Sequence, residues 1–309
     1  MKLEPEAPVL VIVLGPTAVG KSRVAVDLAL RFGGEVISGD SIQVYRGFDI
    51  GTDKPSLEVR RGVPHHLIDI VDPEVQYTAA DFVRDALAAA RGIAARGRLP
   101  IVAGGTGLYL KALLDGLFPG PGRDPAVRAA LEAEAREKGL DALFRRLEAV
   151  DPAYAGKIRD RDRIRIIRAL EVHAATGRPI SEHFRTTESP VRGRTVIRLG
   201  LTLDRETLVR RIDDRVERMF ARGLVEEVRG LIERGVPESA PPFRALGYSH
   251  VLRLLKGEIG RPDAVALTKT DTRQYAKRQM TWFRKMAGVA WFSPDDGPGL
   301  EQQVRNRLQ

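Results

Sequence analysis

Residues 15 to 22 read Gly15-Pro16-Thr17-Ala18-Val19-Gly20-Lys21-Ser22, a match to the phosphate-binding pattern G-x(4)-G-K-S. An apolar run, Val9 to Leu14, precedes the match, and a helix-like stretch begins near Ser22. In this pattern the glycines let backbone N–H groups converge on phosphate oxygens, Lys21 adds a positive charge, and Ser22 offers a hydroxyl to Mg²⁺. The N-terminal end of the following helix adds further positive potential. The segment therefore predicts a site for a phosphate-bearing substrate.

Strand-like and helix-like segments alternate from residue 9 to about residue 117, which is typical of a parallel α/β sheet. In order they are Val9 to Leu14, Lys21 to Phe32, Glu35 to Ser38, Thr78 to Arg96, and Leu99 to Ala103. Thr195 to Leu203 is strand-like again. We therefore predict an α/β fold whose core is a parallel sheet of the P-loop NTPase type.

A breaker cluster, Pro119 to Pro125, marks the clearest boundary in the chain. Residues 125 to about 185 then follow a helical pattern throughout, with stops at Gly139, Asp151-Pro152 and Gly177. This predicts an all-helical domain inserted between core strands. The expected divisions are a first part of the core at 1–122, a helical insertion at 123–190, and a return to the core with C-terminal helices at 191–309.

Composition narrows the class of protein. The chain has 309 residues, 43% of them hydrophobic, so there is ample material for a packed core. The apolar stretches are strand-sized, and the beginning, Met1 to Glu6, lacks the form of a signal peptide. The absence of cysteine excludes disulfides and Cys-ligated zinc. We expect a cytoplasmic protein without a membrane segment.

The chain is basic, with 50 Lys and Arg residues against 41 Asp and Glu residues and a formal net charge of +9. Such an excess favours a polyanionic partner where it clusters. It does cluster at residues 157–168, which carry six positive charges. Arginines on a helix there could point toward phosphates, although a solvated helix face would account for the same pattern.

Carboxylates near the loop decide which phosphate chemistry is expected. A nucleoside triphosphatase pairs this loop with an apolar strand that ends in a Mg²⁺-binding carboxylate, but Leu99 to Ala103 ends in Gly104-Gly105-Thr106-Gly107. This counts against ATP or GTP hydrolysis, although Asp69 or Asp72 could supply the carboxylate. Asp40 follows the strand Glu35 to Ser38 at the sheet edge where ligands bind, so it could be a Mg²⁺ ligand or a general base.

The chain resembles the bacterial tRNA dimethylallyltransferases, also called tRNA isopentenyltransferases. Enzymes of this family prenylate an adenosine beside the anticodon. The similar segments keep a consistent order over residues 10 to 292. They are Gly15 to Ser22, Ser38 to Ser41 with Gln43 and Tyr45, Asp49 to Pro55, Pro64 to His66, Tyr77 to Phe82, Gly104 to Tyr109, Arg168 to Val172, Gly247-Tyr248, and Thr272 to Gln279.

The resemblance implies transfer of a dimethylallyl group from dimethylallyl diphosphate to N6 of adenosine 37 in the tRNA anticodon loop, with diphosphate as the leaving group. It implies that Gly15 to Ser22 and Arg215 bind the diphosphate, that Ser22 holds Mg²⁺, and that Asp40, Thr17 and Lys21 are catalytic. Asp40 would take the proton of the attacking amine. The partner is then an anticodon stem-loop, and we expect the enzyme to be a monomer.

The resemblance also implies a set of tRNA contacts on several segments. They are Asp40, Ser41, Ile42, Gln43, Thr106, Arg128, Ile164, Arg165, Ile166, Ile167, Arg168, Arg244, Ala245, Leu246, Gly247, Tyr248 and Ser249.

Three alternatives stay open on the residues alone. A P-loop small-molecule kinase would share the loop and transfer phosphate from ATP. An adenylate prenyltransferase would act on a free nucleotide, although the basic helical insertion argues for RNA. A non-catalytic RNA-binding module would make Asp40 dispensable.

His65 and His66 have no ligand partner at zinc spacing, so we expect structural roles for them.

Overall fold

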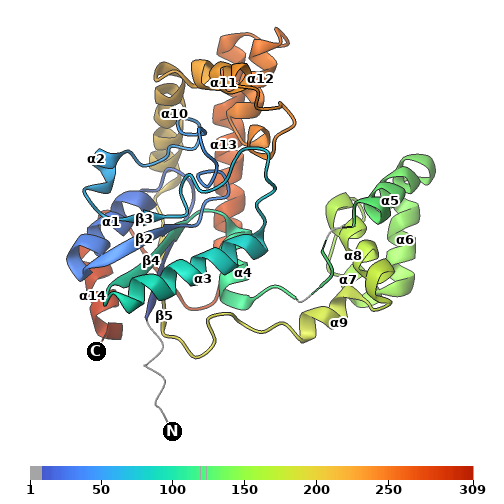
Figure 1. Ribbon diagram of the computed structural model, residues 1–309, viewed down its shortest axis with the longest axis horizontal. Helices are drawn as coiled ribbons and strands as arrows, with labels where there is room; N and C mark the ends of the chain where they lie inside the picture. The colour runs from blue at the N-terminus through green and yellow to red at the C-terminus, as the bar shows by residue number, and fades with distance from the viewer. Residues whose placement is uncertain (1–8, 119, 123, 309) are drawn as a thin grey trace. The chain divides into compact units, whose positions relative to one another are not determined.

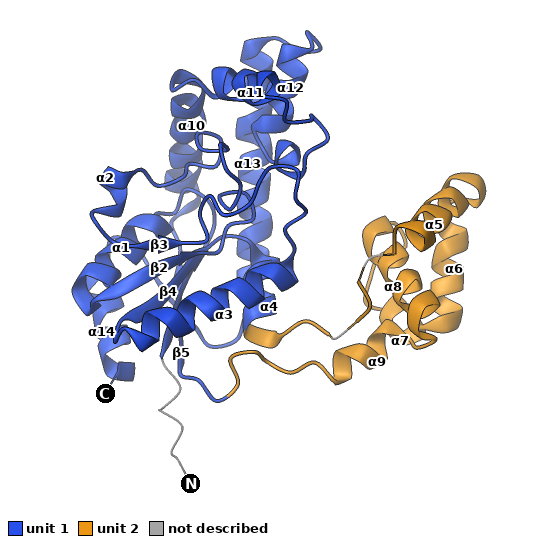
Figure 2. Cartoon of the chain, in the orientation of Figure 1, with its two compact units in different colours: residues 1–113, 193–309 blue, residues 114–192 orange. Residues whose placement is uncertain are grey.

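The computed structural model describes residues 9–118, 120–122 and 124–308. The stretch Met1 to Glu6, Pro119 of the breaker cluster and the expected domain start at Arg123 lie outside the described residues. The chain divides into two compact units, Met1–Leu113 with Gly193–Gln309 and, separately, Leu114–Arg192 (Figure 2). The chain thus changes unit near residues 113 and 193, where the sequence placed the boundaries near 122 and 190.

The first unit contains a six-stranded parallel sheet with the order β3-β2-β4-β1-β5-β6 (Figure 1). Its strands are β1 Leu10–Leu14, β2 Gly34–Ser38, β3 His65–His66, β4 Leu99–Gly104, β5 Val196–Leu201 and β6 Val289–Phe292. Because β1 is central and all its residues are buried, the loop that leaves it is anchored on a rigid element.

Along the residues that the structure describes, the first unit also contains ten helical segments. They are α1 Lys21–Phe32, α2 Leu57–Arg60, α3 Ala79–Ala95, α4 Gly107–Asp115, α10 Arg205–Ala221, α11 Leu224–Glu233, η1 Pro241–Arg244, α12 Tyr248–Leu255, α13 Arg261–Phe283 and α14 Gly297–Leu308. Helices α1 and α14 share a core cluster with one face of the sheet, and α3 packs on β2 and β4 from the other (Figure 1).

Local chemistry explains several helix ends. Thr78 and Asp81 form a capping box at the start of α3, and the side chain of Asp204 accepts a hydrogen bond from Thr207 N at the start of α10. Helix α1 ends at Gly33, whose φ of 63° lies in the left-handed region that glycine adopts without strain. These caps match the signals that the sequence carries at the same positions.

The second unit is wholly helical among its described residues. Its helices are α5 Pro125–Lys138, α6 Leu140–Val150, α7 Pro152–Ala155, α8 Arg163–Thr176 and α9 Ile180–Arg185. Leu131, Leu143, Leu147, Ile166 and Leu170 form the centre of its own core cluster. The unit therefore has its own hydrophobic core.

Two short strands were absent from the sequence prediction. β3 has two residues and β6 has four, so neither is long enough to show a clear alternating pattern. β5 begins at Val196 and ends at Leu201, which is shorter at both ends than the strand-like run Thr195 to Leu203. Within the described ranges, no helix combines the length and apolar character needed to cross a membrane.

Candidate active site

The Gly15–Ser22 segment joins the carboxyl end of β1 to the first turn of α1. Gly15 has a φ of 150° and Gly20 a φ of 107°, and the non-glycine residue Ala18 also has a positive φ of 63°. A Cβ at Gly15 would lie 2.7 Å from the carbonyl oxygen of Leu201 in β5. Glycine is therefore required at residue 15 both for its backbone angle and for close packing, and the loop takes the curled path of an anion-binding nest.

Lys21 lies at the inner end of this loop. Its Nζ donates a hydrogen bond of 2.7 Å to the carbonyl oxygen of Pro16. Desolvation lowers the pKa of Lys21 to about 7, with a further lowering by the nearby charge of Arg215 and an opposing effect of Asp40. An anion bound in the loop would favour the charged form of this lysine, so anion binding and protonation of Lys21 are coupled.

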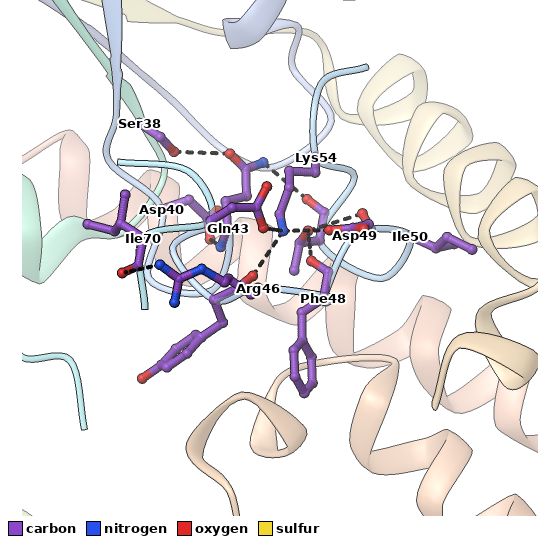
Figure 3. A network of polar contacts seen from close by, with 12 residues as sticks. Ser38, Asp40, Gln43, Arg46, Phe48, Asp49, Ile50, Lys54 and Ile70 are labelled. Carbon is purple, nitrogen blue, oxygen red and sulfur yellow. Dashed lines mark hydrogen bonds and ion pairs between the residues drawn. The ribbon is translucent and has the colours of Figure 1, made fainter. Parts of the chain in front are cut away.

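Asp40 lies two residues beyond the carboxyl end of β2, in a tight turn (Figure 3). Its Oδ1 accepts hydrogen bonds from the backbone N–H groups of Ile42, at 2.8 Å, and Gln43, at 3.3 Å. Within the part of the chain that the structure describes, the second oxygen, Oδ2, accepts no hydrogen bond. The turn thus fixes the carboxylate through one oxygen and leaves the other available to a ligand.

Arg215 of α10 contacts the phosphate loop through the hydroxyl of Thr17. Its Nη1 donates to Thr17 Oγ1 at 2.9 Å, and its Nη2 donates to the carbonyl oxygen of Thr52 at 3.3 Å. Its Nε lies 3.5 Å from a carboxylate oxygen of Asp53, and 19% of the side chain is exposed. These contacts hold the guanidinium beside the loop, where one face of it borders a cavity.

Gln279 of α13 is a site residue that sequence reasoning did not assign. Its Oε1 accepts a hydrogen bond of 2.8 Å from the backbone N–H of Thr17, and its Nε2 donates one of 2.7 Å to the carbonyl oxygen of Gly105. The side chain is 6% exposed. It connects the phosphate loop with the loop after β4. The only sequence signal was its place in the segment Thr272 to Gln279.

Two cavities meet at these residues. The first, of about 390 Å³, is polar and cationic, with Lys21, Ser22, Arg23 and Arg211 in its lining. The second, of about 270 Å³, is more apolar. Its lining includes Ile42, Val216, Met219, Ala245 and Leu246. Both cavities are lined by the same five residues, which are Thr17, Asp40, Thr52, Arg215 and Tyr275.

The five residues that line both cavities form a shared wall between them, and its composition has a chemical consequence. An anion in the first cavity and a largely apolar group in the second would be separated only by a layer that carries one carboxylate and one guanidinium. Tyr275 completes that layer, and desolvation together with the charge of Asp40 raises its pKa to about 12, so its phenol stays neutral at physiological pH. The arrangement can bind a charged group and a neutral group on the two sides of Asp40.

The donor set in the first cavity fits a hard divalent cation. The Ser22 hydroxyl lies in the first turn of α1, and the carboxylates of Asp40 and Asp53 line the same cavity. Oxygen donors of this kind suit Mg²⁺, which also binds substrate phosphates. Asp69 and Asp72 do not serve here, because Asp69 pairs with Lys54 and Asp72 pairs with Arg46, each at 2.5 Å. Among the described residues, no group of three or more His, Asp or Glu side chains has an arrangement that could hold a metal ion by itself, so Ser22 and the substrate phosphates would have to complete such a site.

The histidines expected to be structural have protein partners. His66 lies 2.7 Å from the carboxylate of Glu35, and His65 lies 2.9 Å from the carbonyl oxygen of Val63. Glu35 is 3% exposed, and the hydrogen bonds from Arg96 and His66 lower its pKa despite an opposing desolvation. This cluster lies on β2 and β3, and none of it lines the two cavities.

Among the expected tRNA contacts of the first unit, several line the second cavity. Ser41, Ile42, Arg244, Ala245 and Leu246 lie there together with Asp40. Thr106 Oγ1 accepts a hydrogen bond of 3.1 Å from Ser41 N, which joins the loops after β4 and β2.

The remaining expected contacts of this unit are engaged with the protein. Both ends of the Gln43 amide bind protein groups, Ser38 and Thr52. Gly247 precedes α12, and Ser249 N donates to Ala245 O. Tyr248 is 0% exposed and donates to Glu227, so its side chain presents no surface to a partner.

The expected contacts in the helical unit divide in the same way. Ile164 is 73% exposed, and the half-exposed Arg165 lies 3.4 Å from Asp162. Ile166 and Ile167 are only 0% and 1% exposed, because they fill the core of that unit. Their side chains are therefore packed inside this unit, and the expectation that this stretch contacts tRNA stays a prediction.

Arg168 and Arg128 share an acidic partner. Arg168 donates to Glu171 at 2.9 Å and to the carbonyl oxygen of Pro121 at 2.8 Å, and Arg128 lies 3.8 Å from Glu171 and 3.5 Å from Glu132. Glu171 is 0% exposed. Both arginines thus have a structural task within the unit, which leaves Arg165 as its most accessible candidate for contact with phosphates.

Family models match almost the whole chain. A model described as "IPP transferase" matches residues 43–286, and one described as "Isopentenyl transferase" matches residues 8–66. Among curated relatives, the tRNA dimethylallyltransferase of Thermomicrobium roseum is 52% identical over 97% of this chain and 90% of its own. The enzyme of the same name from Geobacter metallireducens is 51% identical over 93% of each chain.

Solved structures agree with these matches. A full-length tRNA isopentenylpyrophosphate transferase from Bacillus halodurans is 40% identical and superposes with a TM-score of 0.72, covering 98% of this chain and 97% of that one. A eukaryotic dimethylallyltransferase acting on tRNA is 30% identical, with a TM-score of 0.81 over 98% of this chain and 78% of that one.

Proposed function

Because the chain belongs to the IPP transferase family, we propose that it transfers a dimethylallyl group from dimethylallyl diphosphate to N6 of adenosine 37 in tRNA. The observation that carries this proposal is the shared wall of the two cavities. Asp40 and Arg215 lie between a cationic cavity suited to a diphosphate and a more apolar cavity suited to a base. The reacting atoms of two substrates would meet at that wall.

The cationic cavity would bind the leaving group. Residues of the Gly15–Ser22 loop line one cavity together with Arg215, and the Lys21 ammonium and the positive end of α1 add to the positive potential there. These groups stabilise negative charge as the carbon–oxygen bond breaks. Mg²⁺ held by the Ser22 hydroxyl would supply additional neutralisation of the diphosphate.

Asp40 would act as the base. The N6 amine of adenine is a weak nucleophile because its lone pair is delocalised into the ring. As the N6–carbon bond forms and the carbon–oxygen bond breaks, one N6 proton moves to Asp40 Oδ2, which has no other hydrogen bond within the described structure. Diphosphate leaves with its electron pair, so charge and atoms balance. The fixed turn at Oδ1 keeps the carboxylate aligned during the step.

The adenosine would enter from the second cavity. A base must leave its stack to reach a buried site, and an anticodon-loop base is poorly paired, so that cost is small. The apolar lining from Ile42, Val216 and Met219 suits a flat heterocycle. Arg165 and the net charge of +9 would add sequence-independent attraction to the RNA backbone. We expect the enzyme to act in the cytoplasm as a monomer.

The direct test is incubation with dimethylallyl diphosphate and an anticodon stem-loop, followed by mass analysis of the RNA. The proposal expects one added five-carbon unit that requires both the diphosphate and Mg²⁺. A free adenosine nucleotide in place of the stem-loop should be a poor acceptor. Efficient transfer to that nucleotide, or phosphate release from ATP with unmodified RNA, would contradict the proposal and favour an adenylate prenyltransferase or a kinase.

A further inference from the structure

Lys54 lies in the loop between β2 and α2, and its ammonium is almost enclosed (Figure 3). Nζ lies 2.5 Å from Asp49 Oδ1, 2.5 Å from Asp69 Oδ1 and 2.9 Å from the carbonyl oxygen of Tyr45. The Lys54 side chain is 5% exposed, whereas its two acidic partners are about half exposed. An ammonium has three N–H donors, so each donor has one acceptor here.

The contacts with Tyr45 and Asp49 lie within the loop that contains Lys54, and the contact with Asp69 joins this loop to the segment before α3. Lys54 N also donates to Asp49 O at 3.0 Å, so the backbone and the side chain of Lys54 both bind residue 49. Asp69 N donates to Gln43 O at 3.2 Å, and Tyr45 pairs with Val71 in a parallel bridge. The Lys54 ammonium therefore adds side-chain contacts at residues 45, 49 and 69 to segments that these backbone hydrogen bonds already bring together.

The backbone around this lysine is strained. Asp53, Leu67 and Asp69 have φ values of 51°, 60° and 57°, in the left-handed region that L residues seldom occupy. Such a conformation persists only where the surrounding contacts determine it. Two of these residues are direct neighbours of the ammonium, one by sequence and one by ion pairing.

One branch from this loop leads to Asp40. The Gln43 side chain donates to Thr52 O at 3.2 Å and accepts from Ser38 Oγ at 3.0 Å, and Gln43 N donates to Asp40 Oδ1. The carbonyl of Thr52 lies two residues before Lys54. The position of the Thr52 carbonyl therefore determines the position of the Gln43 side chain. Gln43 in turn stabilises the turn that carries the Asp40 carboxylate.

A second branch leads from the same carbonyl to Arg215. Arg215 Nη2 donates to Thr52 O at 3.3 Å, and Arg215 Nε lies 3.5 Å from Asp53 Oδ2. One carbonyl oxygen thus accepts hydrogen bonds from both Gln43 and Arg215. The segment Thr52–Asp53 is a common support for the groups on the two sides of the reacting carbon.

We propose that Lys54 is a positioning residue for the transfer reaction, which fixes Thr52–Asp53 and so sets the separation of Asp40 and Arg215. This role rests on the proposed function. Lys54 is not among the lining residues of either cavity. Its removal should slow the chemical step, because a shift of about 1 Å in a catalytic group costs as much as 100-fold in rate. Arg215 also binds the diphosphate, but it keeps its hydrogen bond to Thr17, and Lys21 and the loop do not contact Lys54, so the Kd for diphosphate should change much less than kcat.

The experiment measures kcat and KM for dimethylallyl diphosphate with an anticodon stem-loop, together with the Kd for inorganic diphosphate and the Tm. Lys54→Met should lower kcat by about 10- to 100-fold and leave Kd within a few-fold of wild type. Lys256→Met is the matched control, because Lys256 pairs with Glu238 at the same distance of 2.5 Å but at the exposed surface. That control should keep the wild-type kcat.

A triple variant separates positioning from charge balance. Lys54→Met combined with Asp49→Asn and Asp69→Asn removes the two carboxylates that Lys54→Met alone would leave uncompensated, but it does not restore the three contacts of the ammonium. The proposal expects the triple variant to regain Tm while kcat stays low. Recovery of kcat together with Tm, or a wild-type kcat in Lys54→Met alone, would overturn it. If Lys54→Met does not fold, Lys54→Gln provides the same comparison, because its amide can reach at most two of the three acceptors. Failure of the wild-type chain to prenylate the stem-loop would instead refute the proposed function.

Discussion

Replacing Asp40 with asparagine removes the proposed proton acceptor and preserves the turn that carries it. The amide oxygen of asparagine can accept the two hydrogen bonds now made to Oδ1, at 2.8 Å from Ile42 N and 3.3 Å from Gln43 N. We therefore expect the free energy of unfolding to change by less than about 1 kcal/mol, the net value of one hydrogen bond. Asp40→Ala would lose both bonds and serves as the less conservative variant.

The rate should fall much more than the stability. Loss of a positioned general base costs about 10²- to 10⁴-fold, which corresponds to about 3–5 kcal/mol in activation free energy. The amide group of asparagine can still contact the adenine amine, so RNA affinity should stay near the wild-type value. A fall in rate without a fall in affinity is the signature of a group that acts in the transition state.

The assay is single-turnover transfer from labelled dimethylallyl diphosphate to a stem-loop, with enzyme in excess. Asp27→Asn is the matched control, since Asp27 lines neither cavity and pairs with Arg61 at the exposed surface. Because exposed pairs of this kind contribute only about 0.2–1 kcal/mol to stability, this control should keep the wild-type transfer rate. An Asp40→Asn rate within threefold of wild type, with the turn intact, would refute the assignment of the base.

Three further predictions address binding and stability. The pKa of Lys21 is about 7 without ligand, and a bound anion raises it. Diphosphate binding above pH 7 should therefore take up a proton and weaken as the pH rises. Calorimetry in buffers of different ionisation enthalpy tests this, and a binding enthalpy that does not depend on the buffer would contradict it. Gln279→Leu should lower the free energy of unfolding by about 2–4 kcal/mol, because it leaves two buried backbone groups unpaired. Urea denaturation measures this, and a change below 1 kcal/mol would contradict the bridge. Arg165→Ala should reduce the salt dependence of stem-loop binding by about one ion and leave Tm unchanged. Arg168→Ala should lower Tm, because Glu171 loses its nearest cation. Equal effects of the two variants on Tm would contradict this distinction.

Local patterns in the sequence were sufficient for the centre of the fold. The phosphate loop is contiguous, so its motif fixes the strand before it and the helix after it. Asp40 could be placed at the same sheet edge because it directly follows a buried strand. The helical insertion followed from its period and its breakers. Each of these features depends on residues near one another in the chain.

The rest of the site depends on contacts between distant residues, which no local pattern encodes. Gln279 binds a backbone group 262 positions away, and Arg215 binds the hydroxyl of Thr17 198 positions away. The enclosure of Lys54 is visible only in the structure, because two of its three acceptors are Tyr45 and Asp69, which lie nine and fifteen positions away in the chain.

The burial of one helix face in the second unit agrees with the spacing of its apolar residues. Ile166, Ile167 and Leu170 fall on one face of a helix, a spacing that predicts burial in a core, as the structure has them. Ile164 lies off that face and is exposed. The periodicity thus separates the buried isoleucines from the exposed one, while their contacts with tRNA stay a prediction.

The central claim is that the Gly15–Ser22 loop holds a diphosphate that leaves intact while Asp40 accepts the proton of an RNA amine. It is tested most directly by measuring, in one reaction, the diphosphate released and the five-carbon units attached to adenosine 37 of a stem-loop. The account predicts one diphosphate for each modified adenosine, no orthophosphate, and loss of both products when adenosine 37 is replaced by uridine. Orthophosphate release, or diphosphate release that continues at an undiminished rate without modification of the RNA, would contradict it.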